Sequence, residues 1–259
     1  MAQDRMAPFL KDGKSMLLAY DQGLEHGPSK DFDDRNVDPS FIMETAVRGQ
    51  FNGVVFQKGV AERFYTGKVP LIVKVNGKTG LPQGEPMSKQ VCSVEHAVSL
   101  GAKAVGYTIY LGSGFEAEML AEFGRVQEEA HRKEVAAIAW IYPRGAGVQN
   151  DTSKEIVAYA ARTGLELGAD AVKIKYTGDA ASFSWAVKSA AGMRVFMSGG
   201  PKAANDEAFL QQVQGVMEAG ATGLAVGRNV WQSRDPVKMA ERIRKVIFER
   251  KSAAEAVKQ

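Results

Sequence analysis

The stretch that decides the fold is LGAKAV at residues 100–105, which recurs as LGADAV at 167–172 and as AGATGL at 219–224. In each copy a helical pattern ends at a glycine, where a left-handed backbone conformation costs little. An apolar run typical of a buried strand follows within two residues. Each copy therefore predicts a junction at which a helix ends and a buried strand begins.

The same alternation of strand and helix continues outward from these junctions. Eight apolar runs have strand character, at 15–20, 53–57, 71–75, 104–109, 136–142, 171–176, 194–198 and 223–226. Helical patterns lie among them at 39–49, 93–100, 115–133, 153–167, 182–191, 206–219 and 235–249. Asp38 before Pro39 predicts a helix start, because aspartate caps a helix and proline fits its first turn.

Strands that alternate with helices form parallel sheets with right-handed crossovers. Eight units in 259 residues match the size of a closed (β/α)8 barrel. An open doubly wound sheet is the alternative, but it rarely reaches eight regular units without another domain. No linker is visible, so we expect an α/β protein of the TIM-barrel class, with one domain over residues 1–259. The irregular stretches 22–37 and 76–91 each follow a strand and would lie on the catalytic face.

Composition limits the compartment and the partners. The chain has 33 Lys and Arg against 30 Asp and Glu, and a net charge of +3 is too small to indicate nucleic acid or a membrane as a partner. Cys92 is the single cysteine, so no internal disulfide can form. No apolar run approaches the roughly 20 residues that span a bilayer. We therefore expect a cytoplasmic protein without nucleic-acid or membrane partners.

The three histidines, His26, His96 and His131, show no metal-ligand spacing. His96 and His131 fall in predicted helices and are expected at the surface, whereas His26 follows the first strand and could reach the mouth of a barrel. No nucleotide-binding glycine motif occurs in the chain. The expectation is a protein without metal and without cofactor.

Polar residues follow each of the eight predicted strands, at the ends that carry function in barrels of this class. Any one of them could be a solvated loop side chain, but eight such ends together favour a site. In chain order they are Asp21, Lys58, Asn76 with Gly77 and Lys78, Tyr110, Tyr142 with Arg144, Lys173 with Lys175, Ser198 with Gly199 and Gly200, and Gly227 with Arg228.

Lys173 and Lys175 are the most informative pair. Side chains alternate along a strand, so in AVKIKY both lysines share one face, and the apolar set should face the helices. A buried lysine can be the partner of a carboxylate, or it can be an amine that forms a Schiff base. A second cation and an apolar setting would lower its pKa and leave free amine at neutral pH. The alternation does not choose between the two lysines.

Two glycine turns end the last two predicted strands. SGGP contains Ser198, Gly199 and Gly200, and VGRN contains Gly227 and Arg228. Backbone N–H groups in such turns cradle phosphate, and Arg228 would add a fixed cation. Two ordinary tight turns are the alternative, but these positions coincide with the usual phosphate site of the barrel.

The segment WIYPRG places Trp140 and Tyr142 on one face of a strand, ahead of Arg144. A buried tyrosine is usually a hydrogen-bonded structural residue, and a role as acid or base would need a nearby cation such as Lys173. Asp21 ends the first strand. It could cap a loop, pair with a buried lysine or act as a catalytic carboxylate, and the residues alone leave the last two open.

These residues together resemble the archaeal-type class I fructose-bisphosphate aldolase family. The likeness covers nearly the whole chain in order. It is carried by LLAYDQGLEHGP (17–28), GVVFQKG (53–59), VNGKTGL (75–81), GAKAVGYTIYLGSGFE (101–116), YPRG (142–145), NDTSKEIVAYAAR (150–162), GADAVKIKYTGD (168–179), MSGGPK (197–202) and AGATGLAVGRNVWQ (219–232).

The resemblance implies a metal-independent lyase of glycolysis and gluconeogenesis that reversibly cleaves fructose 1,6-bisphosphate through an iminium on Lys173. It implies proton transfer by Tyr142, with Asp21 handling the C4 hydroxyl and the carbinolamine, and with Trp140 shaping the site. The C1 phosphate would bind Ser198, Gly199, Gly200, Gly227 and Arg228, and the second phosphate Arg144. Members of the family often have Asp-His-Gly where this chain has Asp21-Gln22-Gly23, so no imidazole acts at position 22.

Relatives with the same lysine and tyrosine offer alternatives. One group makes 2-amino-3,7-dideoxy-D-threo-hept-6-ulosonate, and another acts on a phosphorylated signalling ketone. A non-catalytic phosphosugar-binding barrel is an alternative of a different class, and it would require an inert Lys173. The family also implies a phosphorylated ketose as substrate and a homo-oligomer of high order.

Overall fold

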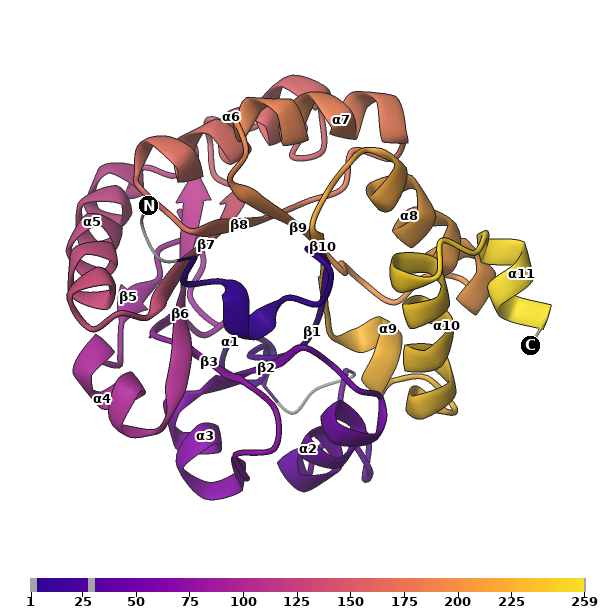
Figure 1. The fold of residues 1–259 in the computed structure, drawn as a ribbon. Coiled ribbons are helices and arrows are strands. Elements are labelled where there is room, and N and C mark those ends of the chain that lie inside the picture. Colours follow the sequence, from indigo (N-terminus) through magenta and orange to yellow (C-terminus); the bar gives the residue numbers. More distant parts are fainter. Residues whose placement is uncertain (1–3, 28–30, 259) are drawn as a thin grey trace.

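The structure is a computed structural model that describes residues 4–27 and 31–258. Eight parallel strands close into a barrel in the order β1–β10–β9–β8–β7–β6–β3–β2. They are β1 (Ser15–Tyr20), β2 (Gly53–Gln57), β3 (Leu71–Lys74), β6 (Ala102–Leu111), β7 (Ala136–Pro143), β8 (Ala171–Ile174), β9 (Arg194–Ser198) and β10 (Gly223–Val226). Helices ring the strands (Figure 1), and the predicted (β/α)8 barrel is confirmed.

Helices lie between the strands. They are α1 (Gly23–His26), α2 (Pro39–Arg48), α3 (Lys58–Phe64), α4 (Val94–Ser99), α5 (Glu116–Arg132), α6 (Lys154–Glu166), α7 (Ala180–Ser189), α8 (Asp206–Glu218), α9 (Arg228–Trp231), α10 (Pro236–Phe248) and α11 (Ala253–Lys258). Six of them (α2, α4, α6, α7, α8 and α10) begin at a side-chain cap. Asp38 accepts a hydrogen bond from the Ser40 amide at 2.9 Å, as predicted for the start of α2.

The three repeated junctions have the predicted backbone. Gly101, Gly168 and Gly220 have φ values of +90°, +74° and +89°, a region that residues with a Cβ rarely adopt. Each glycine ends a helix and lets the chain turn at once into β6, β8 or β10. The loops at this end of the barrel are therefore short, which leaves the longer loops for the opposite end.

Two hydrophobic cores hold the barrel together. The larger one lies between the strands and the helices, whereas the smaller one fills the inside of the barrel. The fully buried side chains of Met6 and Phe9 belong to the inner core. Phe9 lies in a short 3-10 helix, Ala7–Phe9. In Figure 1 the indigo N-terminal segment crosses the barrel opening. Phe9 packs against Gly53, the first residue of β2, so this segment closes the N-terminal end of the barrel.

Four strands differ in length from the prediction, two of them by a single residue, since β3 ends at Lys74 and β7 at Pro143. β6 extends to residues 102–111 because it pairs with β7 as far as Leu111 and Pro143. The predicted strand 171–176 is β8, which ends at Ile174 because its pairing with β9 stops there. Lys175 and Tyr176 therefore lie beyond the strand, and the strict alternation predicted for AVKIKY applies only as far as Ile174.

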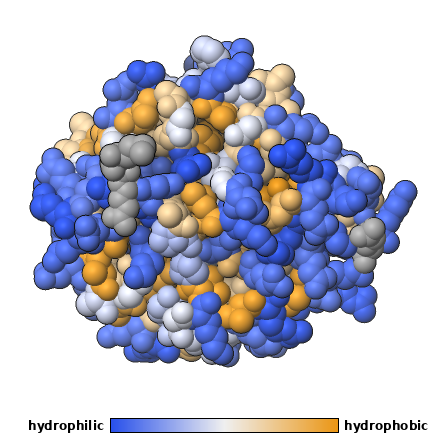
Figure 2. Space-filling model, viewed as in Figure 1, coloured by the Kyte–Doolittle hydropathy of each residue, from blue (hydrophilic) through white to orange (hydrophobic). Residues whose placement is uncertain are grey.

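Several short elements were not predicted. α3 follows β2 directly, and a hairpin of β4 (Asn76–Gly77) and β5 (Lys89–Gln90) forms inside the loop after β3. Hydrophilic residues cover most of the face shown in Figure 2, with hydrophobic residues between them. No helix in the described ranges is long and apolar enough to cross a membrane.

Candidate active site

A cavity of about 240 Å³ lies at the carboxyl ends of the barrel strands. Every barrel strand, or the loop that follows it, contributes to its wall. The lining includes nine of the ten predicted site residues: Asp21, Tyr142, Arg144, Lys173, Ser198, Gly199, Gly200, Gly227 and Arg228. The tenth, Trp140, lies inside the barrel among the residues of the inner core.

Lys173 lies near the centre of this arrangement. It is the third residue of β8, it is 5% exposed, and its neighbours Val172 and Ile174 face the helix layer as predicted. Burial lowers the pKa of its amine; the charge of Asp21 opposes this shift and the charge of Arg228 adds to it. Nζ has no hydrogen-bond or ion-pair partner among residues 4–27 and 31–258. A buried, unpaired amine with a lowered pKa is suited to attack a carbonyl carbon.

Trp140 packs directly against this lysine. Its ring centre is 5.2 Å from Lys173 Nζ, a distance at which the ring face attracts a cation. The indole lies over Gly106 of β6, where an added Cβ would come within 2.0 Å of the ring. The buried Nε1 of Trp140 has no hydrogen-bond partner in the described part of the chain. Gly106 thus provides the space that lets the indole lie against Lys173.

Tyr142 enters the cavity from β7. Its hydroxyl lies 3.4 Å from Ser198 Oγ at the end of β9. Burial raises the pKa of the Tyr142 phenol, and the charges of Asp21 and Glu25 raise it further, although the Ser198 hydrogen bond acts in the opposite direction. The phenol is therefore protonated at neutral pH and is available as a proton donor.

The turns after β9 and β10 form one side of the cavity. Gly200 has a φ of +61°, and a Cβ at Gly199 would lie 3.0 Å from Val226 Cγ2, so both positions favour glycine. The Asn229 side chain donates to the backbone oxygens of Gly199 at 2.8 Å and of Pro201 at 3.0 Å. This buried amide ties the two turns together. Asn229 was missed in the sequence, although it belongs to the quoted VGRN.

Arg228 points into the same side of the cavity. Its Nη1 lies 3.3 Å from Asp31 Oδ2, which also contacts His26 Nδ1 at 3.1 Å. The buried Nε of Arg228 and Oε1 of Gln22 have no hydrogen-bond partners in the described part of the chain. An anion at this side would find an arginine, glycine-turn amides and the first amides of α9, which have no acceptor within their helix.

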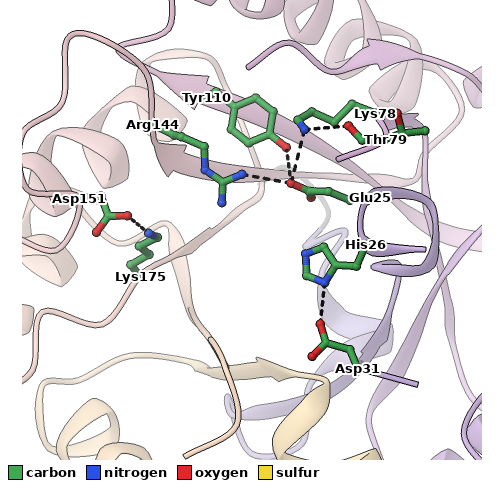
Figure 3. A network of polar contacts seen from close by, with 9 residues as sticks. All are labelled: Glu25, His26, Asp31, Lys78, Thr79, Tyr110, Arg144, Asp151 and Lys175. Carbon is green, nitrogen blue, oxygen red and sulfur yellow. Dashed lines mark hydrogen bonds and ion pairs between the residues drawn. The ribbon is translucent and has the colours of Figure 1, made fainter. Parts of the chain in front are cut away.

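A second group of cationic side chains lines the same cavity, and Figure 3 shows its contacts. Glu25 Oε1 lies 3.1 Å from Arg144 Nη1 and 3.9 Å from Lys78 Nζ, and it accepts a hydrogen bond from Tyr110 at 3.3 Å. The Arg144 guanidinium also stacks on the Tyr110 ring, 5.2 Å from its centre. The sequence singled out Arg144 here but not Glu25, and Glu25 lies 119 residues away in the chain.

The remaining predicted strand-end residues have other positions. Lys175 lines the cavity, but its ammonium forms an ion pair with Asp151 from the loop after β7 (Figure 3). Lys58 begins α3 and donates to the Val91 carbonyl oxygen, away from the cavity. Pro28, part of the quoted EHGP segment, lies outside the described residues.

Lys74 is a cavity residue that the sequence reasoning missed. It ends β3, is 5% exposed and lines the same cavity as Lys173. The signal was available, since LIVKV is a buried strand with an inward lysine and the argument applied to AVKIKY fits it as well. Burial lowers the pKa of Lys74 to about 8, with Asp21 and Glu25 opposing the shift and Lys173 adding to it.

No group of three or more His, Cys, Asp or Glu side chains suited to a metal gathers within the described ranges. The histidines lie apart, and His131 contacts Asp170 at 2.8 Å on the outside of the barrel. The polar groups that line the cavity include amines, guanidinium groups, phenols, carboxylates, hydroxyls, the His26 imidazole and backbone amides.

A closed barrel in which a buried lysine has no partner among the described residues and shares a cavity with a phenol and a carboxylate is typical of enzymes that bond to carbonyl substrates through a lysine imine. Comparison with known proteins gives the family. The model of the DeoC/LacD aldolase family matches residues 15–233, and the chain belongs to this family. The family resemblance of the sequence is confirmed.

Curated and solved relatives agree with this assignment. The chain is 57% identical to the class 1 fructose-bisphosphate aldolase of Thermoproteus tenax over 95% of its own length and 94% of that protein. It is 43% identical to the class 1 enzyme of Halobacterium salinarum, with 97% of each chain covered.

Among solved structures, an archaeal fructose 1,6-bisphosphate aldolase matches with a TM-score of 0.92 at 56% identity, over 95% of this chain and 98% of that one. A second archaeal aldolase, with its catalytic lysine bound to the carbinolamine intermediate, matches with a TM-score of 0.92 at 55% identity and the same coverage. The chain is therefore a class I aldolase, a lyase that works through a Schiff base.

Proposed function

We propose that this aldolase reversibly cleaves fructose 1,6-bisphosphate to dihydroxyacetone phosphate and glyceraldehyde 3-phosphate without a metal, through an iminium on Lys173. The observation that carries the proposal is the position of this lysine. Its amine is buried, has no partner in the described chain, and shares one cavity with two separate groups of anion-binding residues. A ketose with a phosphate at each end matches that arrangement.

The phosphates position the substrate. The C1 phosphate binds the turns that contain Ser198, Gly199, Gly200, Gly227 and Arg228, where the buried Arg228 Nε has no hydrogen-bond partner in the described part of the chain. The second phosphate binds Arg144 and Lys78 and takes the place of Glu25 as their counter-ion. Binding energy from both ends then holds the reacting carbons at the amine.

The reaction begins when the neutral Lys173 amine attacks the C2 carbonyl and forms a carbinolamine, which loses water to give the iminium. The C4 hydroxyl proton passes to the Asp21 carboxylate, and the O–H electron pair becomes the aldehyde π bond. The C3–C4 pair becomes the enamine double bond, and the iminium π pair returns to nitrogen. Glyceraldehyde 3-phosphate then leaves.

Tyr142 completes the cycle. Its protonated phenol donates a proton to C3 of the enamine, and the proton held by Asp21 returns to the phenolate through solvent. Water then hydrolyses the iminium and releases dihydroxyacetone phosphate. Burial supports this role for Tyr142 because it keeps the phenol protonated. Trp140 holds the lysine side chain in place from below.

The test is borohydride reduction in the presence of dihydroxyacetone phosphate, followed by mass spectrometry of the peptides. We expect an adduct on Lys173 that is lost in Lys173→Met, together with at least a roughly 10³-fold loss of cleavage. Lys175→Met is the matched control and keeps the adduct, because Lys175 is paired with Asp151.

Other results would contradict the proposal in distinguishable ways. An adduct on Lys175 would keep the aldolase and correct the site. An adduct with deoxy ketoses only would move the chain to the synthase relatives, and no adduct with any ketose would indicate a phosphosugar-binding barrel. Loss of activity in a chelator would contradict metal independence.

We also propose that the enzyme acts in the cytoplasm, in glycolysis and gluconeogenesis, as a homo-oligomer of high order. The support is the family resemblance together with the full-length likeness to the class 1 aldolases. Light scattering coupled to size-exclusion chromatography tests the assembly. A monomeric mass at micromolar concentration would contradict it.

A further inference from the structure

A second buried amine shares the barrel with Lys173. Lys74 is the last residue of β3, and the alternation of the strand directs it inward, because Ile72 belongs to the inner core and Val73 to the outer one. Only 5% of the residue is exposed, and it lines the active-site cavity. Lysine is rarely buried unless its amine has a partner or a task.

The neighbours of Lys74 satisfy its amine only in part. Nζ donates one hydrogen bond, to the Asn76 backbone oxygen at 3.2 Å. No carboxylate of residues 4–27 and 31–258 comes within 4.0 Å of it. An ammonium has three N–H donors, so donor capacity remains on the side of the cavity.

The amine is held in place by a rigid support. The Asn76 side chain is fully buried and donates to the backbone oxygens of Thr108 at 2.8 Å and of Ser88 at 3.1 Å, while its Oδ1 accepts from the Thr108 amide at 2.7 Å. This network fixes the backbone oxygen on which Lys74 rests. The position of the amine is therefore set by β3, β6 and the hairpin between them.

The charged groups that face Lys74 are Asp21, Glu25 and Lys173. The two carboxylates favour the ammonium form, and with a pKa of about 8 Lys74 is mostly charged at neutral pH. Asp21 lies within electrostatic reach of both lysines but has no ion-pair partner within 4.0 Å in the described chain. The space among these three groups is open to a polar group of a ligand.

The direction in which the proposed substrate would lie in the cavity identifies this polar group. With the C1 phosphate at the turns after β9 and β10, and C2 bonded to Lys173 on β8, the rest of the ketose extends towards Arg144 and Lys78. β3 and β6 lie on that side of the barrel. The oxygen on C4 therefore lies on the Lys74 side of the scissile bond.

We propose that Lys74 is a further catalytic residue, which donates a hydrogen bond to the C4 oxygen as this oxygen becomes the aldehyde carbonyl. The inference rests on the proposed cleavage of a ketose phosphate. Asp21 takes the O–H proton and the C3–C4 electron pair moves into the enamine, while Lys74 keeps its own proton. In the condensation direction the same ammonium polarises the aldehyde for attack by the enamine carbon.

Three measurements on Lys74→Met test the proposal. Borohydride trapping of dihydroxyacetone phosphate reports imine formation on Lys173. Exchange of the C3 proton of this ketone with heavy water reports enamine formation, which needs Lys173 and Tyr142 but no aldehyde. We expect both to stay within about 3-fold of wild type, and cleavage of fructose 1,6-bisphosphate to fall about 10²- to 10³-fold.

Two further variants keep the proposal falsifiable. Lys103→Met is the matched control, because Lys103 is exposed on β6, and it should not change any of the three measurements. Should Lys74→Met fail to fold, Lys74→Arg keeps a cationic donor, and we expect it to retain exchange and at least a tenth of the cleavage activity. A Lys74→Arg variant with exchange intact and no detectable cleavage would refute a role for the cation.

Other outcomes of these measurements would refute either the role of Lys74 or the proposed substrate. Equal losses of exchange and cleavage in Lys74→Met would assign the residue to imine chemistry, and unchanged cleavage would leave it without a catalytic role; either result overturns the inference. A wild-type enzyme that exchanges the proton but does not cleave fructose 1,6-bisphosphate would instead refute the proposed substrate.

Discussion

Two lysines with equal burial, Lys74 and Lys173, are placed in different electrostatic surroundings. Burial lowers the pKa of both amines. At Lys74 two carboxylates, Asp21 and Glu25, oppose this fall and the charge of Lys173 adds to it, whereas at Lys173 Asp21 alone opposes it and Arg228 adds to it. The second carboxylate thus favours the charged form at Lys74. A nucleophile and a cation of the same residue type can coexist in one cavity because of this difference.

The pH dependence of imine formation follows from the same charges. The Lys173 amine reacts only when deprotonated, so the rate of borohydride trapping rises with pH through its pKa. Asp21→Asn removes the carboxylate that holds this pKa up, so we expect the midpoint of the rise to move to lower pH. Trapping rates with dihydroxyacetone phosphate measured from pH 5 to 10 check this. Asp12→Asn, in an exposed turn, should leave the midpoint in place, and a shift to higher pH in Asp21→Asn would contradict the account.

Among the elements, the pairing of β6 with β7 fixes the position of the Trp140 indole next to Lys173. Thr108 pairs with Trp140 and Gly106 with Ile138, which places the indole over the backbone of Gly106. Because glycine has no side chain, the ring can lie against both the strand and Lys173. The position of the Lys173 amine, the proposed nucleophile, therefore depends on Gly106, a residue of a different strand that does not line the cavity.

Gly106→Ala tests this dependence. The new Cβ would lie 2.0 Å from the Trp140 ring, and we expect overpacking to cost about 1–3 kcal/mol of unfolding free energy together with a loss of imine trapping. Urea unfolding and borohydride trapping measure the two effects. Gly124→Ala is the control: Gly124 lies inside α5 with nothing within 4 Å of its added Cβ, so a gain of about 0.5–1 kcal/mol is expected. A Gly106→Ala enzyme as stable and as reactive as wild type would refute the packing argument.

The elements also show how far the sequence could predict the structure. All eight barrel strands were predicted because each is a short buried run next to a glycine turn or a helix start. α3 was missed because it has only seven residues and Gln57 makes no side-chain cap. The hairpin of β4 and β5 has only two residues in each strand, which is too short for a periodic pattern.

The site was predictable where it depends on strand position, and not where it depends on loop paths. Lys173, Tyr142 and Asp21 could be assigned to strand ends from the sequence and reach one cavity. The contact of Glu25 in α1 with Arg144 in the loop after β7 joins residues 119 positions apart in the chain, and no local pattern specifies it. The strand pattern predicts that Lys74 points inward, but a role for this lysine is suggested only by the presence of Lys173 in the same cavity.

In the molecule as a whole, apolar residues that stabilise the barrel and the residues of the candidate active site lie at opposite ends. Met6 and Phe9 fill the N-terminal end, whereas the cavity with its charged residues occupies the carboxyl end. Three of the six buried polar atoms that lack a hydrogen-bond partner in the described part of the chain, those of Trp140, Gln22 and Arg228, lie at or next to the cavity. The apolar end can compensate for that cost because it takes no part in binding.

Phe9→Ala should therefore lower the stability of the protein without changing its activity. Removing a fully buried phenylalanine is expected to cost about 3–5 kcal/mol of unfolding free energy, while kcat at 25 °C stays within 2-fold of wild type. Chemical unfolding and steady-state cleavage at a temperature where the variant is folded measure both. A large fall in kcat with unchanged stability would show that the two ends are coupled.

The Asn229 amide, which joins the turns after β9 and β10, has a consequence for turnover. Because the Asn229 side chain belongs to the segment after β10 and bonds two carbonyl oxygens of the turn after β9, we expect the two turns to move as one unit. In the proposed cycle, the phosphate of dihydroxyacetone phosphate would then leave only when both turns move. The hydrogen bonds that shape the proposed phosphate site would therefore also slow release of the product.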